Sequence, residues 1–308
     1  MASAVFPVAA NVPDLSGSYI PRLYAMKILI ELYNTTVFGA IANTDYEGMV
    51  QNQGDTVRIR TLPDIDINSY TNGQNLVYQT PDPSYLDLLI DKGLYWAMSL
   101  NAVDLKQADI AYPQPWATHA AKLLSIELDR ALLADIYGDV HASNAGTSAG
   151  AISGNIDLGT SADAFDFTPA NSIQGLVNAS QALDEQNVPV DGRWIVLPSV
   201  AWSALLMSDL KDASLAGDGT SIVRNGRVGT VANFTIYQSN QVPLVSDSGN
   251  AWHCLFGHSM SLTFAAQMTK TETLRNQFDF GDLMRSLMVY GYKVVKPEAM
   301  GWLYAYKG

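Results

Sequence analysis

The sequence has little cysteine and little charge. Its only cysteine is Cys254, so no disulfide can form within one chain, and we expect a reducing compartment. Charged residues make up 16% of the 308 residues, against a usual share of about 25%. A chain that hides much of its surface against copies of itself needs fewer charges to stay in solution. The low charge content therefore indicates extensive self-assembly.

Basic residues and long apolar runs are also scarce. There are 18 Lys and Arg against 30 Asp and Glu, which gives a net charge of −12. This balance argues against direct wrapping of nucleic acid and against binding to an anionic membrane. No apolar run approaches the length of a membrane span. The N-terminal residues lack the basic region and apolar stretch of a signal peptide, so we expect neither a membrane nor a secretory location.

Motifs that carry chemistry are mostly missing. The sequence has no phosphate-binding loop, no G-x-G-x-x-G and no nucleophile elbow. His253, Cys254 and His258 are possible soft-metal ligands, but neighbouring residues of a strand face opposite sides, which favours ordinary packing. The acidic pair Asp184-Glu185 is expected to be solvated surface. We therefore predict no catalytic residue, no metal and no cofactor, and keep a metal-dependent enzyme as an alternative.

One stretch with a clear pattern is GDTVRIRTLPDIDI, residues 54–67. Apolar and charged residues alternate as in a half-buried strand, and Pro63 interrupts the run, which favours an edge position. The apolar side is predicted to carry Val57, Ile59, Ile65 and Ile67. The charged side is predicted to carry Arg58, Arg60, Asp64 and Asp66.

A return strand is expected at residues 84–98, after a turn at Asn72-Gly73. Asp87 and Asp91 on this strand are expected to oppose Arg58 and Arg60. The two runs would form a long two-stranded arm, and a lone hairpin is only marginally stable in water. We therefore expect the arm to lie on something outside its own domain.

The rest of the chain mixes helices and strands, which predicts an α+β fold. Apolar residues at helical spacing predict a long helix over 115–137, and a second unit begins near 166 with a helix and a strand at 193–198. Further predictions are a helix over 19–43, a short helix over 99–110, a flexible loop over 138–155, and strands from 250 to the C-terminus.

Five segments in this order resemble the major capsid proteins of tailed bacteriophages, which have the Hong Kong 97-type shell fold. They are DYEGMVQNQGDTVRIRTLPDI, DKGLYWAMSLNAVDLKQADI, GRWIVLPSVAWSALLMSD, NGRVGTVANFTIYQSNQVP and YGYKVVKPEAMGWLYA. The resemblance extends over about residues 19–306. It implies an N-terminal arm and helix (1–44), an extended loop (45–98), a peripheral domain with a spine helix (99–165), an axial domain (166–280) and return strands (281–308).

The resemblance also implies a function. The chain would be a structural subunit that forms the pentamers and hexamers of an icosahedral phage head, assembled in the host bacterial cytoplasm around double-stranded DNA. The extended loop would contact a neighbouring subunit through Arg58, Arg60, Asp64, Asp66, Asp87 and Asp91. A separate scaffolding protein, a portal and a decoration or cement protein are the partners it implies. A nanocompartment shell of the same fold is the first alternative.

Overall fold

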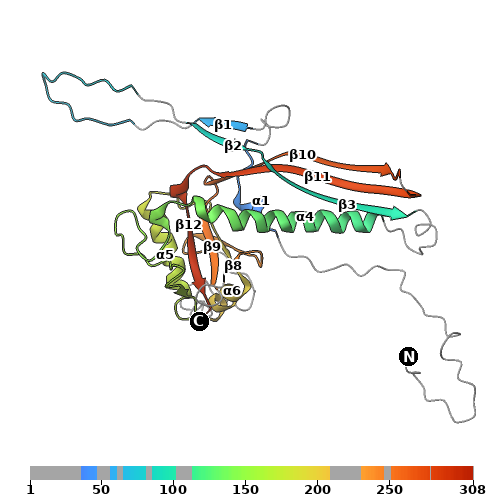
Figure 1. The fold of residues 1–308 in the computed structure, drawn as a ribbon. Helices are drawn as coiled ribbons and strands as arrows, with labels where there is room; N and C mark the ends of the chain where they lie inside the picture. The colour runs from blue at the N-terminus through green and yellow to red at the C-terminus, as the bar shows by residue number, and fades with distance from the viewer. Residues whose placement is uncertain are drawn as a thin grey trace, which may run out of the picture.

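The computed structural model describes residues 36–46, 56–60, 65–80, 85–101, 113–208, 230–245, 251–277 and 279–307. These residues form two sheets, a long helix and a projecting arm (Figure 1). No described helix is long and apolar enough to span a membrane.

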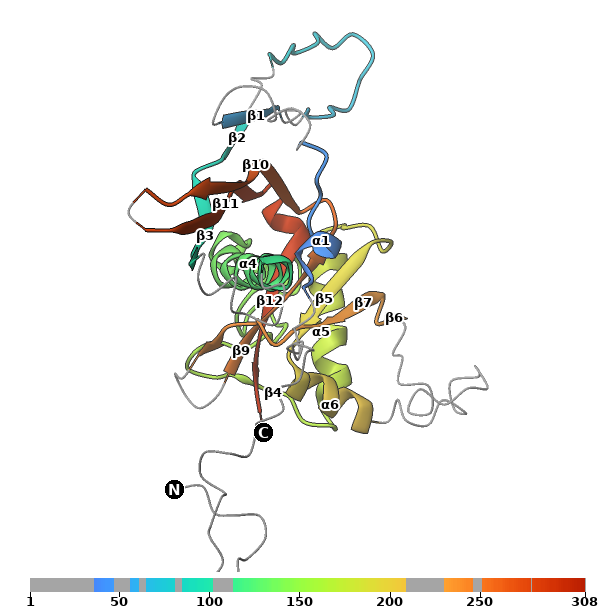
Figure 2. The same ribbon diagram turned by 90° about the vertical axis from the view of Figure 1, so that its right-hand side faces the viewer.

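The larger sheet has seven strands, in the order β4-β12-β9-β5-β7-β6 with β8 beside β9. Its central strand β5 (Arg193–Leu197) is buried on both faces. Helices α5 (Ser172–Glu185) and α6 (Ser199–Met207) pack over Ile195 and Leu197 on one face (Figure 2), and Trp194 and Val196 on the other face join a second cluster that includes the long helix. The remaining strands are β4 (Phe165–Asp166), β6 (Thr230–Val231), β7 (Phe234–Gln238), β8 (Leu244–Val245), β9 (Ala251–His258) and β12 (Met300–Tyr306).

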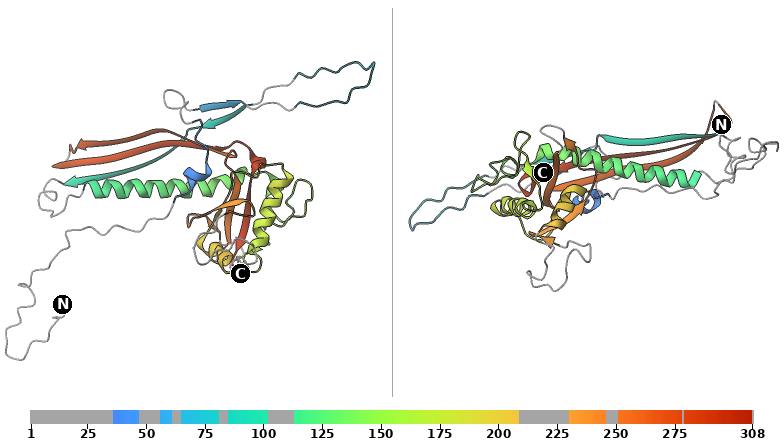
Figure 3. Two further views of the ribbon diagram at one scale, coloured as in Figure 1. Left: turned by 180° about the vertical axis from the view of Figure 1, so that it is seen from behind. Right: turned by 90° about the horizontal axis from the view of Figure 1, so that it is seen from below.

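The smaller sheet is antiparallel and has three strands, in the order β10-β11-β3. These are β10 (Leu262–Arg275), β11 (Gly281–Val294) and β3 (Lys92–Asn101). The long helix α4 (Pro113–Asp135) runs along one face of this sheet (Figures 1 and 3). Leu94 and Met288 from that face pack against the cluster that contains Leu128 and Leu132 of α4, so the helix and the sheet share one core.

The chain passes between the two sheets three times. It first goes from β3 through α4 to β4 in the larger sheet. It leaves β9 at His258 and enters β10 at Leu262, and after β11 the short 3-10 helix η5 (Pro297–Ala299) leads it back to β12 in the larger sheet. Residue 280 is therefore not a boundary between the two sheets, and the final strand β12 belongs to the larger sheet. The predicted divisions 166–280 and 281–308 are corrected accordingly, because pairing with β9 places β12 in the larger sheet.

The arm is shorter as a ladder than the sequence predicted. Strand β1 (Thr56–Arg60) pairs with β2 (Tyr85–Leu89), while residues 65–80 are outside any ladder. The chain then bends into β3, which pairs with β11 and not within the arm. The loop 65–80 and the free end of the three-stranded sheet project in opposite directions from the body (Figures 1 and 3).

Other predicted elements differ in their bounds. The predicted helix 19–43 lies mostly outside the described residues, which hold only the short helix α1 (Phe38–Ile41) there. Residues 99–101 end strand β3, and the remainder of the helix predicted over 99–110 lies outside the described residues. The long helix spans 113–135 where 115–137 was predicted.

The segment 138–155, predicted as a flexible loop, contains regular structure and internal hydrogen bonds. It contains two 3-10 helices, η1 (Ile136–Asp139) and η2 (Ala142–Asn144), and Ala149 bridges Ile156. The Glu185 carboxylate accepts hydrogen bonds from the backbone N–H groups of Ile152 and Ser153 at 2.8 and 3.0 Å. These bonds from Ser153 and Ile152 lower the pKa of Glu185 to about 2 and fix the loop to α5.

A buried carboxylate fixes the segment around α1. Asp129 of α4 is fully buried and accepts hydrogen bonds from the backbone N–H groups of Val37 and Phe38 at 3.2 and 3.0 Å. Downstream, the Asn43 N–H donates to the Leu262 carbonyl at 2.8 Å. Burial raises the pKa of Asp129, and the two backbone hydrogen bonds oppose that effect.

We expect Asp129→Ala to lower the free energy of unfolding by about 1–3 kcal/mol, because one buried and one partly buried N–H group lose their acceptor. Asp129→Asn should cost less, since it keeps an acceptor oxygen without a buried charge. The raised pKa means that the folded chain holds this proton more tightly than the unfolded chain, whose value lies near 3.8. The stability of the wild type relative to Asp129→Asn should therefore be greatest at low pH and fall as pH rises. Denaturation series across pH check this, and a difference that grows with pH would contradict it.

Candidate assembly site

The arm loop exposes apolar side chains that no described part of the chain covers. Every residue from 65 to 80 is exposed, and Ile67, Val77 and Tyr78 are 97%, 80% and 87% accessible. Ile65, Tyr70 and Leu76 are also among the exposed large apolar residues. An apolar surface of this kind on a soluble protein marks a site of contact with another molecule.

The observed pairing of β1 with β2 agrees with one of the two predicted charge pairs. Arg58 lies directly opposite Asp87, and its Nε donates to Asp87 Oδ1 at 2.9 Å. The hydrogen bond raises the pKa of Arg58 and lowers that of Asp87. The Arg58 guanidinium also lies 4.0 Å from the centre of the Tyr85 ring. The predicted alternation is confirmed over these five residues, with Val57 and Ile59 on the less exposed side.

The other charged residues predicted for the arm do not form the expected pairs. Arg60 lies opposite Tyr85, and the expected pairing with Asp91 is wrong. In an antiparallel ladder, moving two residues forward on β1 means moving two back on β2, so one register cannot satisfy both predicted pairs. Asp66 instead accepts a hydrogen bond from Gln79 Nε2 at 2.9 Å across the loop. Asp64 lies outside the described residues.

The tip of the arm turns where the sequence predicted. The Gln74 N–H donates to the Thr71 carbonyl at 3.0 Å, and Gly73 has a φ of +91°. A φ in this range favours glycine, which has no Cβ to clash. The Asn72-Gly73 prediction is confirmed.

The base of the arm sits on the three-stranded sheet through a small apolar cluster. Ile59 of β1, Leu88 of β2 and Ile90 are buried together with Ala265 of β10. At Gly291 of β11, a Cβ would clash with the backbone carbonyl of Leu89. The backbone of β2 can cross β11 this closely only because residue 291 has no side chain.

Charged groups line a cleft of about 230 Å³ next to this crossing. Lys92 Nζ donates to Asp135 Oδ2 at 2.9 Å, and the Tyr292 hydroxyl donates to the same oxygen at 2.8 Å. Hydrogen bonds from Lys92 and then Tyr292 lower the pKa of Asp135, and burial raises the pKa of Tyr292 to about 12. A second pair, Lys293 with Asp139, lies beside it at 2.9 Å. No local sequence pattern points to any of these residues.

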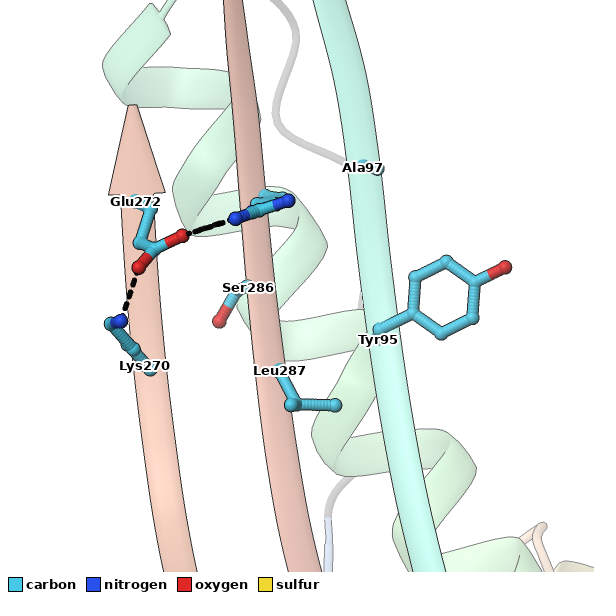
Figure 4. A pocket seen from close by; sticks show the side chains of 7 residues that line it. Tyr95, Ala97, Lys270, Glu272, Ser286 and Leu287 are labelled. Carbon is cyan, nitrogen blue, oxygen red and sulfur yellow. Dashed lines mark hydrogen bonds and ion pairs between the residues drawn. The ribbon is translucent and has the colours of Figure 1, made fainter. Parts of the chain in front are cut away.

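The three-stranded sheet has an outer face turned away from α4. Tyr95, Lys270, Glu272, Arg285 and Leu287 line a shallow hollow of about 490 Å³ on this face (Figure 4). Glu272 forms ion pairs with Lys270 and with Arg285, the latter at 2.7 Å, while the Tyr95 side chain is 78% exposed. The face therefore combines aromatic, aliphatic and charged groups that a second molecule can contact.

The three residues weighed as possible metal ligands are not brought together. His253 packs among the rings of Tyr137, Trp302 and Tyr304, whereas Cys254 lies in the opposite core and burial raises the pKa of its thiol. His258 Nε2 lies 2.7 Å from the Asp191 carbonyl. In the described part of the chain, no group of three or more His, Cys, Asp or Glu is placed to hold a metal.

The acidic pair at 184–185 is not plain solvated surface, as the sequence had suggested. Asp184 accepts a hydrogen bond at 2.6 Å from Arg193, whose side chain is fully buried. Glu185 holds the loop at 150–154 as described above. Both carboxylates are structural ties within the seven-stranded unit.

Comparisons with known proteins identify the family to which this chain belongs. The phage capsid protein family matches residues 86–305, which is most of the chain. The chain belongs to this family and is a structural subunit of a phage capsid. A search of curated proteins found no match.

Solved structures of phage capsids have the same fold. A chain of Mycobacterium phage Che8 matches with a TM-score of 0.75 and 24% identity, over 93% of this chain and 97% of that one. The capsid of cyanophage P-SCSP1u matches with a TM-score of 0.74 and 16% identity, over 99% and 100%. The mature capsid of bacteriophage PhiM1 matches with a TM-score of 0.69 and 16% identity, over 93% and 92%. The predicted Hong Kong 97-type fold is confirmed, and a nanocompartment shell is not favoured.

Proposed function

We propose that the chain assembles into the pentamers and hexamers of an icosahedral phage head, with its arm lying on a neighbouring subunit. The observation that carries the proposal is the exposed loop 65–80, whose apolar side chains are not packed against any of the residues that the structure describes. Arg58, Arg60, Asp64, Asp66, Asp87 and Asp91 are the charged residues proposed to act at this contact.

The outer face of the three-stranded sheet is the surface proposed to receive the neighbouring arm. The arm and this sheet project in opposite directions (Figure 3), which suits a head-to-tail contact between different faces of identical subunits. Contacts of this heterologous kind close into rings when the rotation between subunits allows it. Many weak contacts of this sort add up across a shell.

Domain roles follow from the same arrangement. The seven-stranded unit is proposed as the axial domain that packs around the centre of each ring. The three-stranded sheet with α4 is proposed as the peripheral domain, with α4 as its spine. Residues 1–44 are proposed as the N-terminal arm and its attachment, and 45–91 as the extended loop, ending where β3 joins the sheet.

The head is proposed to enclose double-stranded DNA without binding its sequence. The net charge of −12 supports this role, because an acidic wall does not hold the packaged polyanion tightly. Assembly is proposed to take place in the host bacterial cytoplasm, with a separate scaffolding protein, a portal and a decoration or cement protein as partners. The family and fold point to a structural protein, and the dispersed positions of His253, Cys254 and His258 give no support to a metal-dependent enzyme.

Electron microscopy of the purified chain tests the proposal, with and without co-expression of its neighbouring genes. We expect closed shells, tubes, or rings of five or six subunits at high protein concentration. Uniform small particles in both preparations would contradict assembly by this chain.

A further inference from the structure

The contacts at the base of the arm divide into two kinds. The apolar cluster of Ile59, Leu88, Ile90 and Ala265 and the crossing of Leu89 over Gly291 hold the arm at one point on the sheet. Apolar contacts are not directional, so a single such point leaves the arm free to swing. A directional contact beside that point is needed to set an angle.

The group around Lys92 supplies this second contact. Lys92 begins β3, just after the chain leaves the arm, while Asp135 ends α4 and Tyr292 lies on β11. Lys92 Nζ binds Asp135 Oδ2 at 2.9 Å and lies 4.5 Å from the centre of the Tyr292 ring. One ammonium group therefore ties the start of β3, the residue that directly follows the arm, to both the long helix and β11.

The Lys92 cation stabilises the carboxylate of Asp135, which lies in an unfavourable position. Asp135 is the last residue of α4, where the helix dipole disfavours a negative charge, and the last turn of the helix contains no basic residue. Lys92 and Lys293 are the cations that come close to it from other elements. Asp135 therefore lies where the helix dipole disfavours its charge, and Lys92, directly after the arm, neutralises that charge. This arrangement indicates a specific coupling between α4 and the base of the arm.

We infer that Lys92 is a positioning residue that sets the angle of the arm relative to α4, and that this angle decides whether assembled subunits close into shells of uniform curvature. The inference rests on the proposed role of the arm in assembly. Head-to-tail contacts close only when each subunit presents its contact at the correct rotation. A loosened arm would present it at several rotations and give open or irregular products.

A matched pair of variants tests the inference. Lys92→Met removes the charge and keeps most of the stem. Lys293→Met is the control, because Lys293 has the same 2.9 Å pair length, to Asp139, and a side-chain exposure of 38% against 37% for Lys92. The pair of Lys293 joins β11 to η1 and does not involve the arm. The rescue variant exchanges the charges, with Lys92→Asp and Asp135→Lys together.

The angle is measured on the full-length chain before assembly, with spin labels at Thr56→Cys in β1 and Ala121→Cys in α4, two exposed positions outside the proposed contact. The native Cys254 is buried, and burial raises the pKa of its thiol, so it should not react. We expect Lys92→Met to raise the population of displaced arm positions about fivefold. Lys293→Met should leave the distances unchanged, and the charge exchange should restore them.

Electron microscopy of the same variants then measures assembly. Lys92→Met should give open, tubular or irregular products where Lys293→Met and the exchanged pair give the wild-type shells. Equal distance distributions in Lys92→Met and Lys293→Met would overturn the inference, and so would displaced arms that still build uniform shells. Failure of the proposed arm function is a separate result, namely wild-type shells from a chain without residues 65–80.

Discussion

A chain in which a short Gly-Ser linker replaces residues 65–80 should fold but should no longer form shells. All of these residues are exposed and outside the buried clusters, so the free energy of unfolding should change by less than about 1 kcal/mol. The loop instead holds the uncovered apolar surface on which the proposed contact between subunits depends. Electron microscopy measures assembly, and chemical denaturation confirms that the variant is folded.

A second variant separates the apolar surface from the length of the loop. Ile67→Ser, Val77→Ser and Tyr78→Ser together keep every residue in place and remove three of the most exposed apolar side chains. We expect them to abolish shells as the deletion does, while Asn75→Ser, a polar exchange in the same loop, should leave assembly intact. Wild-type shells from the deletion would show that the arm is not required for assembly.

Arg193→Met should destabilise the seven-stranded unit more than any surface exchange. The Arg193 side chain is fully buried and donates to the carbonyls of Pro189 and Val188 at 2.9 and 2.6 Å, to Ser180 Oγ at 3.2 Å and to Asp184 at 2.6 Å. Methionine fills the space but removes the donor from the buried Val188 carbonyl and Ser180 Oγ, and from the half-buried bond to Pro189. Because each lost partner in a buried site costs about 1–3 kcal/mol, we expect a total loss of about 3 kcal/mol or more.

Urea denaturation of the unassembled chain measures this loss, and the fluorescence of the neighbouring buried Trp194 reports it locally. Arg130→Met is the matched control, because Arg130 pairs with Glu127 at 2.9 Å but its side chain is 58% exposed. An exposed pair contributes about 0–1 kcal/mol, so the control should change the midpoint little. A loss for Arg193→Met no larger than that of the control would contradict the structural role of the buried guanidinium.

Local patterns predicted those parts of the arm whose cause is local. The alternation of Val57 and Ile59 with Arg58 predicted a strand with one charged side, and Asn72-Gly73 predicted the turn, because strand period and turn chemistry depend on adjacent residues. The prediction failed for Asp91, which lies beyond the end of the ladder. The length of the return strand within the arm depends on where β3 meets β11, and no nearby residue encodes that contact.

The residues at the base of the arm were beyond sequence reasoning for the same reason. Lys92, Asp135 and Tyr292 come from three elements separated by dozens of residues, and each is an ordinary charged or aromatic residue in its own segment. Asp129 did carry a signal, since it shares a helix face with the buried Leu132 and Leu133 at spacings of three and four residues. An acid on an apolar face indicates a buried partner, which here is the backbone at Val37 and Phe38.

By itself, the sequence determined the class of fold, the long helix, the arm strand and its turn, and the family, because period, composition and segment order are properties of neighbouring residues. Only the tertiary structure decided that β12 returns to the seven-stranded sheet, that Arg193 is buried among carbonyls and that Lys92 ties the arm to α4. These features depend on contacts between distant segments, and such contacts form only when the whole core excludes water and brings the segments together.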